Sequence, residues 1–240
     1  MRIERQTIVH DGPGGPFEAL AVFDADAAGP RPIVLLFPNV LGLKEADFEK
    51  AEALAALGYA VFCADVYGQG KRTTRQSLNP AAYMDELNND RVLMRERLQA
   101  AFETARAMPQ GDSTRVAAIG FCFGGKCVLD LARSGADFAG GVSFHGVYDP
   151  APQGHGGPIV AKLLVCHGWD DPIAPPEATV ALAKELTDAG VDWQLHAYGN
   201  TAHAFTDKDA DMVERGVYYV ESADRRSWRA MVGFLEECFA

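Results

Sequence analysis

The chain has 240 residues, of which 48% are hydrophobic and 23% charged, and its formal net charge at pH 7 is −11. This composition is typical of a folded globular enzyme and excludes a disordered chain, so we expect one domain over residues 1–240. The negative charge argues against nucleic acid or an anionic membrane as the main partner, and against long-range attraction of anionic substrates.

The chain has five cysteines, an odd number, and no C-x-x-C motif. Cys63 and Cys166 lie in apolar, strand-like runs. The N-terminus lacks the apolar core of a signal peptide, and no apolar run approaches membrane-spanning length. We therefore expect reduced thiols and a cytoplasmic location. No group of His or Cys has the spacing of metal ligands, so neither a metal nor another cofactor is predicted.

The first half of the chain begins with two alternating stretches, near residues 2–9 and 17–23, which predict an antiparallel hairpin. The continuous apolar run Pro32–Phe37 predicts a strand that is buried on both faces. Further elements are expected in this order: a helix near 45–57, a strand at 59–63, and a strong helix near 90–107. The first half of the segment Tyr67–Met108 contains Gly70 and Pro80 and is expected to be a loop.

In the second half, apolar strand-like runs alternate with helical patterns. Strands are expected near 115–120, 139–144, 161–167 and 191–198, and helices from the first of these strands to about 133, near 176–189 and near 222–238. Alternating strands and helices predict an α/β fold with a mostly parallel central sheet and helices on both faces.

One strand–helix junction carries the pattern of a nucleophile. The segment Gly120-Phe-Cys-Phe-Gly124 has the spacing of the nucleophile elbow G-x-S-x-G, with the sulfur of Cys122 in place of the serine oxygen. Glycines allow the sharp turn, and the apex side chain projects from the sheet edge. A helix N-terminus stabilises a thiolate, so we expect the pKa of Cys122 to be lowered. The alternative is a buried structural cysteine.

A cysteine nucleophile needs a base and an orienting acid, and in chains with this elbow the acid comes next and the histidine last. Asp170 and Asp171 follow the third of the later strands, and His203 follows the fourth. The carboxyl ends of parallel strands share one edge, so these side chains are expected to converge there. The residues alone leave Asp170 and Asp171 as alternatives for the acid.

The remaining histidines supply one rival base. His145 follows the strand near 139–144, but it precedes the acid and so breaks the expected order. His167 and His196 lie within predicted strands and are expected to be structural.

Three segments resemble the dienelactone hydrolase family of α/β-hydrolases: Gly120-Phe-Cys-Phe-Gly-Gly125, His167-Gly-Trp-Asp-Asp-Pro-Ile-Ala-Pro175 and Tyr198-Gly-Asn-Thr-Ala-His-Ala-Phe205. The similarity extends from the third strand onward. It implies a single-domain α/β-hydrolase fold that acts on a small-molecule ester or lactone. It further implies that Cys122 is the nucleophile, His203 the base and Asp171 the orienting acid. The loop before Asp90 would then lie over the active site.

The resemblance also implies an oxyanion hole of two backbone N–H groups, one from Phe123 and one from the loop after the third strand, at Val40. Two positions depart from the family. Asn39 stands where family members carry a glutamate that helps to activate the cysteine, and we expect it to contact substrate without acting as a base. Asp207 stands where an arginine would hold a substrate carboxylate. The departure at Asp207 and the net charge of −11 favour a neutral ester or lactone.

The predicted reaction forms a thioester on Cys122, which water then hydrolyses. A neutral phosphotriester presents a similar electrophilic centre, so promiscuous phosphotriester hydrolysis by the same triad is an alternative.

Rivals from other classes also exist. An NTP-binding loop needs Ser or Thr after Gly120-x₄-Gly125-Lys126, where Cys127 stands. A redox-thiol protein would use Cys127 to resolve an oxidised Cys122. An inactive binding module could share the fold. The sequence leaves the oligomeric state open.

Overall fold

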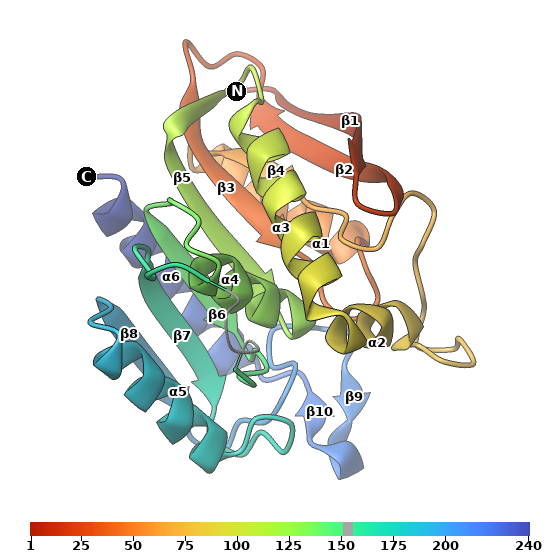
Figure 1. Ribbon diagram of the computed structural model, residues 1–240, viewed down its shortest axis with the longest axis vertical. Coiled ribbons are helices and arrows are strands. Elements are labelled where there is room, and N and C mark those ends of the chain that lie inside the picture. Colours follow the sequence, from red (N-terminus) through yellow and green to blue (C-terminus); the bar gives the residue numbers. More distant parts are fainter. Residues whose placement is uncertain (151–155) are drawn as a thin grey trace. The chain divides into compact units, whose positions relative to one another are not determined.

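The computed structural model describes residues 1–150 and 156–240 (Figure 1). The chain divides into two compact units, residues 1–118 and 119–240, which we describe in turn. The expectation of one domain over residues 1–240 stays a prediction.

The first unit opens with the predicted antiparallel hairpin of β1 (Ile3–Gly12) and β2 (Gly15–Asp24), in which Gly12 is paired with Gly15. β2 pairs antiparallel with β4 (Ala60–Cys63), and β4 pairs parallel with β3 (Arg31–Phe37). The strand order in this unit is therefore β1-β2-β4-β3.

The core of the first unit is built around β3. Its side chains from Ile33 to Phe37 are fully buried, which confirms the predicted strand with two covered faces. Helices α1 (Glu45–Ala56) and α3 (Arg91–Arg106) lie on opposite faces of the strands (Figure 1).

The segment between β4 and α3 contains a helix that the sequence analysis did not predict. α2 (Ala82–Asn89) has 8 residues and buries only Leu87, so its apolar pattern is too short to indicate a helix. Asp90 then caps α3, because its side chain accepts a hydrogen bond from the backbone N–H of Leu93 at 2.9 Å. The expected loop is therefore shorter than predicted.

β5 (Gly111–Phe121) begins in the first unit and ends in the second. Within the second unit, β6 (Gly140–Phe144), β7 (Lys162–Gly168) and β8 (Trp193–Tyr198) pair in parallel in that order. Helices α4 (Phe123–Arg133) and α5 (Pro176–Asp188) lie on one face of these strands, and α6 (Glu221–Cys238) lies on the other (Figure 1).

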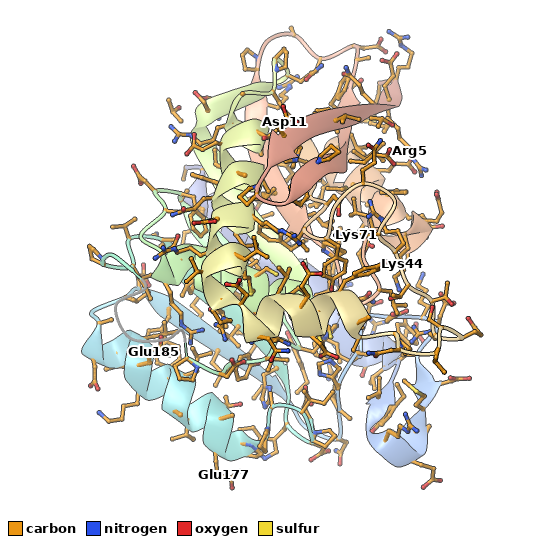
Figure 2. All side chains as sticks on the ribbon, turned by 45° about the vertical axis from the view of Figure 1, so that its right-hand side comes forward. Arg5, Asp11, Lys44, Lys71, Glu177 and Glu185 are labelled. Atoms are coloured by element: carbon orange, nitrogen blue, oxygen red, sulfur yellow. The ribbon has the colours of Figure 1, made fainter. Side chains whose placement is uncertain are left out.

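A buried arginine joins two of these helices. The Arg133 guanidinium of α4 lies 2.7 Å from a carboxylate oxygen of Glu185 in α5, the residue labelled in Figure 2. Arg133 also donates to the backbone oxygens of Tyr148 and Asp149, so it fixes the start of the segment that follows β6.

The predicted fold class is confirmed. Strand pairing is mostly parallel, helices cover both faces of the strands in each unit, and an antiparallel hairpin opens the chain. The sequence analysis missed β9 (Asp211–Met212), the 3₁₀-helix η1 (Val213–Arg215) and β10 (Val217–Tyr218). Among the described residues, no helix is both long and apolar enough to cross a membrane.

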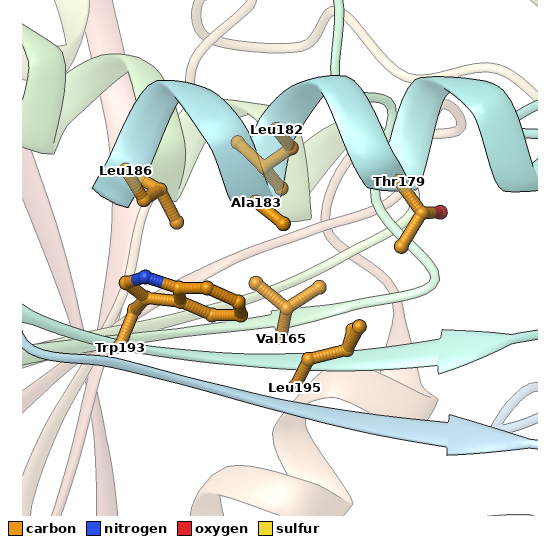
Figure 3. A pocket seen from close by; sticks show the side chains of 7 residues that line it. All are labelled: Val165, Thr179, Leu182, Ala183, Leu186, Trp193 and Leu195. Carbon is orange, nitrogen blue, oxygen red and sulfur yellow. The ribbon is translucent and has the colours of Figure 1, made fainter. Parts of the chain in front are cut away.

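A small cavity lies between α5 and the strands β7 and β8 (Figure 3). Its volume is about 10 Å³, the space of a single water molecule. The lining side chains come from the helix and both strands: Val165, Thr179, Leu182, Ala183, Leu186, Trp193 and Leu195. The Thr179 hydroxyl is already bonded to His167, at 3.0 Å. This cavity is therefore a gap in the packing that is too small for an organic substrate.

Candidate active site

Cys122 occupies the apex of the turn between β5 and α4, with φ 56° and ψ −114°. A residue with a side chain rarely adopts this backbone conformation, which costs about 1–3 kcal/mol and is typical of functional positions. Gly120 makes the turn possible, because a Cβ there would collide with the carbonyl oxygen of Gly124. A Cβ at Gly125 would lie 2.6 Å from the Ser143 hydroxyl, so this glycine lets α4 approach β6 closely.

A buried carboxylate and a buried histidine follow the strands β7 and β8. Nδ1 of His203 is 2.7 Å from Oδ2 of Asp171. The second carboxylate oxygen accepts the backbone N–H groups of Ile173, at 2.8 Å, and Ala174, at 3.2 Å. Because the carboxylate accepts at every contact, Nδ1 of His203 carries a proton and Nε2 is the nitrogen available for proton exchange.

The structure separates the two candidate acids. Asp171 is buried and bonded to His203, whereas the side chain of Asp170 is exposed. The backbone N–H of Asp170 donates to the carbonyl oxygen of Thr201 at 2.9 Å. The structure thus brings Asp171, and not Asp170, to the histidine.

The charges around His203 favour its protonated form. Burial by itself lowers the pKa of this histidine, but negative charge on Cys122 and on Asp171 outweighs burial and raises the pKa to about 10. Within the described residues, Nε2 makes no hydrogen bond of good geometry, although the Cys122 side chain lies close enough to act on the pKa. The three side chains therefore form one electrostatic group.

The backbone of His203 is held by the chain that follows it. Its N–H donates to the carbonyl of Gly216 at 2.9 Å, and its carbonyl accepts the N–H of Tyr218 at 3.1 Å. Two residues further on, the carbonyl of Phe205 accepts the N–H of Val220 at 3.1 Å. The short β9–β10 hairpin, which was not predicted, thus fixes the segment that carries the imidazole.

The rival base His145 lies beside this group. Its Nδ1 is 3.1 Å from the backbone nitrogen of Cys122, and its Nε2 is 2.8 Å from the Thr206 hydroxyl. Its ring meets the His203 ring edge-on, with the centroids 5.2 Å apart. The sequence analysis identified His145 as a rival base from its position after a strand, with chain order against it, and no sequence signal identified Thr206.

The family model named Dienelactone hydrolase family matches residues 17–239. The chain belongs to this family. The match begins within β2, earlier than the third strand at which the sequence resemblance begins.

Individual relatives agree with this assignment. The chain is similar to the crystal structure of a dienelactone hydrolase-like promiscuous phosphotriesterase from metagenomic libraries, with 36% identity, 100% of each chain covered and a TM-score of 0.94. It is 26% identical to a Yersinia pestis protein provisionally named a carboxymethylenebutenolidase, over 87% of this chain and 79% of that one. It is also 33% identical to an uncharacterised Caenorhabditis elegans protein, over 61% of this chain and 95% of that one. The chain is therefore a hydrolase with a small-molecule substrate.

Two residues of the hydrolase bear on the rival classes. Lys126, the cation that a phosphate-binding loop would use, is buried, and its ammonium lies 2.8 Å from a carboxylate oxygen of Asp149. Cys127, the candidate resolving thiol, is buried in α4. Neither arrangement favours nucleotide binding or thiol exchange. Within residues 1–150 and 156–240, no group of three His, Cys, Asp or Glu side chains could hold a metal ion.

The remaining predicted site residues lie at loop and helix starts. Phe123 is the first residue of α4 and is buried. In the first unit, the Asn39 side chain accepts the N–H of Leu41 at 3.0 Å, and the Val40 carbonyl accepts the Tyr67 hydroxyl at 3.1 Å. These contacts order the loop after β3. The oxyanion roles of Phe123 and Val40 and the substrate contact of Asn39 stay predictions.

Proposed function

We propose that this hydrolase cleaves neutral carboxylic esters or lactones through a Cys122–His203–Asp171 triad and a thioester intermediate. The observation that carries the proposal is the 2.7 Å contact between His203 and Asp171, buried beside a cysteine at the apex of an elbow. The proposal takes residues 1–240 as one α/β-hydrolase domain.

In the first half-reaction the Cys122 thiolate attacks the carbonyl carbon of the substrate. The backbone N–H groups of Phe123 and Val40 stabilise the charge that develops on the carbonyl oxygen, and each such donor contributes about 3 kcal/mol. The proton on Nε2 of His203 then passes to the leaving oxygen as the carbon–oxygen bond breaks. The products of this step are an alcohol and a thioester on Cys122.

The thioester changes the protonation of the histidine. Among the influences that raise the pKa of His203, negative charge on Cys122 is the largest. A thioester sulfur carries no charge, so the pKa falls once the acyl group is attached and His203 becomes a base near neutral pH. It then takes a proton from water, the hydroxide attacks the thioester, and the acid and the thiolate are released.

The predicted neutrality of the substrate follows from local and overall charge. Asp207 lies four residues after His203, in the loop where the family resemblance expects a cation, and the net charge of the chain is −11. A substrate carboxylate would be repelled by both.

The test is hydrolysis of p-nitrophenyl acetate by the wild type, by Cys122→Ala and by the matched control Cys127→Ala. We expect kcat to fall by at least about 10³-fold in Cys122→Ala, because the nucleophile is lost, and to change little in the control. Equal turnover in Cys122→Ala and the wild type would overturn the proposed nucleophile. A comparable loss in Cys127→Ala would favour the redox-thiol alternative.

Neutral phosphotriesters are a second candidate substrate class. The similarity to a promiscuous phosphotriesterase, at 36% identity over the whole chain, favours them. In this reaction the thiolate would attack phosphorus and displace the alcohol. Release of p-nitrophenol from a diethyl p-nitrophenyl phosphate, measured against the Cys122→Ala background, tests this activity, and release no faster than that background would remove the candidate.

A further inference from the structure

We propose that His145 is a positioning residue that holds the backbone of the nucleophile and the loop of the base at a fixed spacing, and that it does not take a proton from the substrate or from water. This inference rests on the proposed function, because it explains how Cys122 and His203 keep their positions relative to each other.

The first contact joins His145 to the elbow. Its Nδ1 accepts the backbone N–H of Cys122 at 3.1 Å, and the same N–H also donates to the carbonyl of Phe144 at 3.0 Å. The strand bond with Phe144 remains when the side chain of His145 is replaced, so no buried donor is left unpaired. Loss of the imidazole is therefore expected to alter the direction of the elbow without unfolding the chain.

The second set of contacts joins His145 to the base loop. Because Nδ1 accepts, Nε2 carries the proton and donates it to the Thr206 hydroxyl at 2.8 Å. The ring also meets Phe205 edge-on, with centroids 5.0 Å apart, and His203 with centroids 5.2 Å apart. The His145 side chain thus contacts the backbone of the nucleophile on one side and three residues of the base loop, His203, Phe205 and Thr206, on the other.

These same contacts argue against a role as base. Both ring nitrogens of His145 are occupied, Nδ1 by an amide N–H that does not exchange its proton during catalysis and Nε2 by a hydroxyl. The buried carboxylate of Asp171 orients His203, through the 2.7 Å contact with its Nδ1. A base needs an available nitrogen and an orienting acid, and His203 has both.

The backbone of His145 suits a positional test. Its φ is 37°, in the left-handed region that asparagine tolerates better than most residues. In His145→Asn, the side-chain oxygen takes the place of Nδ1 and can accept the Cys122 N–H. In His145→Gln, the longer side chain reaches toward Thr206 and leaves the Cys122 N–H without this acceptor. Thr206→Val removes the contact with the base loop and keeps the shape of the side chain.

We expect His145→Gln to lower kcat for p-nitrophenyl acetate by about 10- to 100-fold, because a small misplacement of a catalytic group has effects of that size. KM stays close to the wild-type value, and His145→Asn recovers most of the loss. Thr206→Val lowers kcat in the same direction, which keeps the test valid if one His145 variant fails to fold. The pH dependence of kcat keeps its shape in every variant, because His203 remains the titrating base.

Two results would overturn the inference. If His145→Asn and His145→Gln lose activity equally and also lose the limb of the pH profile that reports the base, His145 is the base itself. If both variants match the wild type, His145 has no positioning role. Cys122→Ala separates this from the proposed function: lost turnover there, with unaffected His145 variants, overturns only the positioning role, whereas retained turnover overturns both.

Discussion

Two buried histidines near the ends of β7 and β8 respond to burial in opposite ways. His167, at the end of β7, lies between two hydroxyls: Nδ1 is 3.1 Å from that of Tyr148 and Nε2 is 3.0 Å from that of Thr179. His203, after β8, lies between a carboxylate and a cysteine. Burial lowers the pKa of His167, whereas the neighbouring charges raise the pKa of His203 to about 10 despite burial.

The difference shows that the charge of the partners, and not the depth of the ring, decides which histidine is protonated. His167 uses both nitrogens to hold β7, α5 and the segment after β6 together, which fits its predicted structural role. His203 uses one nitrogen for its carboxylate and directs the other at the elbow. Three changes test this comparison at different strengths.

The largest effect is expected from Asp171→Asn, which preserves the shape of the side chain and removes its charge. The amide can no longer hold the imidazole of His203 in the required tautomer, so we expect kcat to fall by about 10³- to 10⁴-fold. The matched control is Asp170→Asn, the same change one residue earlier on an exposed side chain, which should leave kcat unchanged. Equal losses in the two variants would show that the loop, and not the charge of Asp171, matters.

A smaller effect is expected on the titration of His203 itself. Cys122→Ala removes the largest influence that raises its pKa, so the pKa of His203 should fall from about 10 by about 1 to 3 pH units. Imidazole resonances followed by NMR between pH 5 and about 11 would report the change. The titration of His167 should stay as in the wild type. An unchanged titration of His203 would mean that Asp171 alone sets its protonation.

The smallest effect concerns the pH dependence of stability. His203 and His167 are expected to contribute to it with opposite signs. The raised pKa of His203 contributes stability that is fully present below pH 6.5 and is lost as the pH rises through about 10. The lowered pKa of His167 acts on the acid side, because below about pH 6.5 the unfolded chain binds a proton before the folded chain does. The free energy of unfolding therefore falls as the pH drops.

His167→Gln removes the contribution of this histidine to the loss of stability at acid pH. We expect the slope of the free energy of unfolding against pH, below pH 6.5, to become shallower by at most about 1.4 kcal/mol per pH unit. Urea unfolding at several pH values between 5 and about 7 measures it. His196→Gln, on the exposed side of β8, is the control and should keep the wild-type slope. A slope that is unchanged in His167→Gln would assign the acid sensitivity to other groups.

Much of the fold could be predicted because its long elements have strong local patterns. The apolar run of β3 and the strand-to-helix change around Gly120 are visible in the residues themselves. α2 was missed because it buries only Leu87, and β9 and β10 were missed because two residues are too few to show an alternating pattern. Short elements depend on tertiary contacts that the local sequence does not contain.

The candidate site divides in the same way. Cys122 could be predicted because its elbow requires glycines at fixed spacing. Adjacent acids could not be separated from residue type alone, since Asp170 and Asp171 differ only in which of them is buried against His203. The contacts of His145 depend on a backbone φ of 37° and on one tautomer, and neither is encoded in a motif.

The hairpin beside His203 also bears on how new specificities can arise in this hydrolase. Residues 203–205 are hydrogen-bonded to the chain between Gly216 and Val220, so the segment that carries the His203 imidazole is held by residues further along the sequence. The turn from Asp207 to Asp209 lies outside this hydrogen-bonded stretch. We expect exchanges in this turn to leave the His203 imidazole in place, which makes the turn a suitable target for directed evolution of specificity.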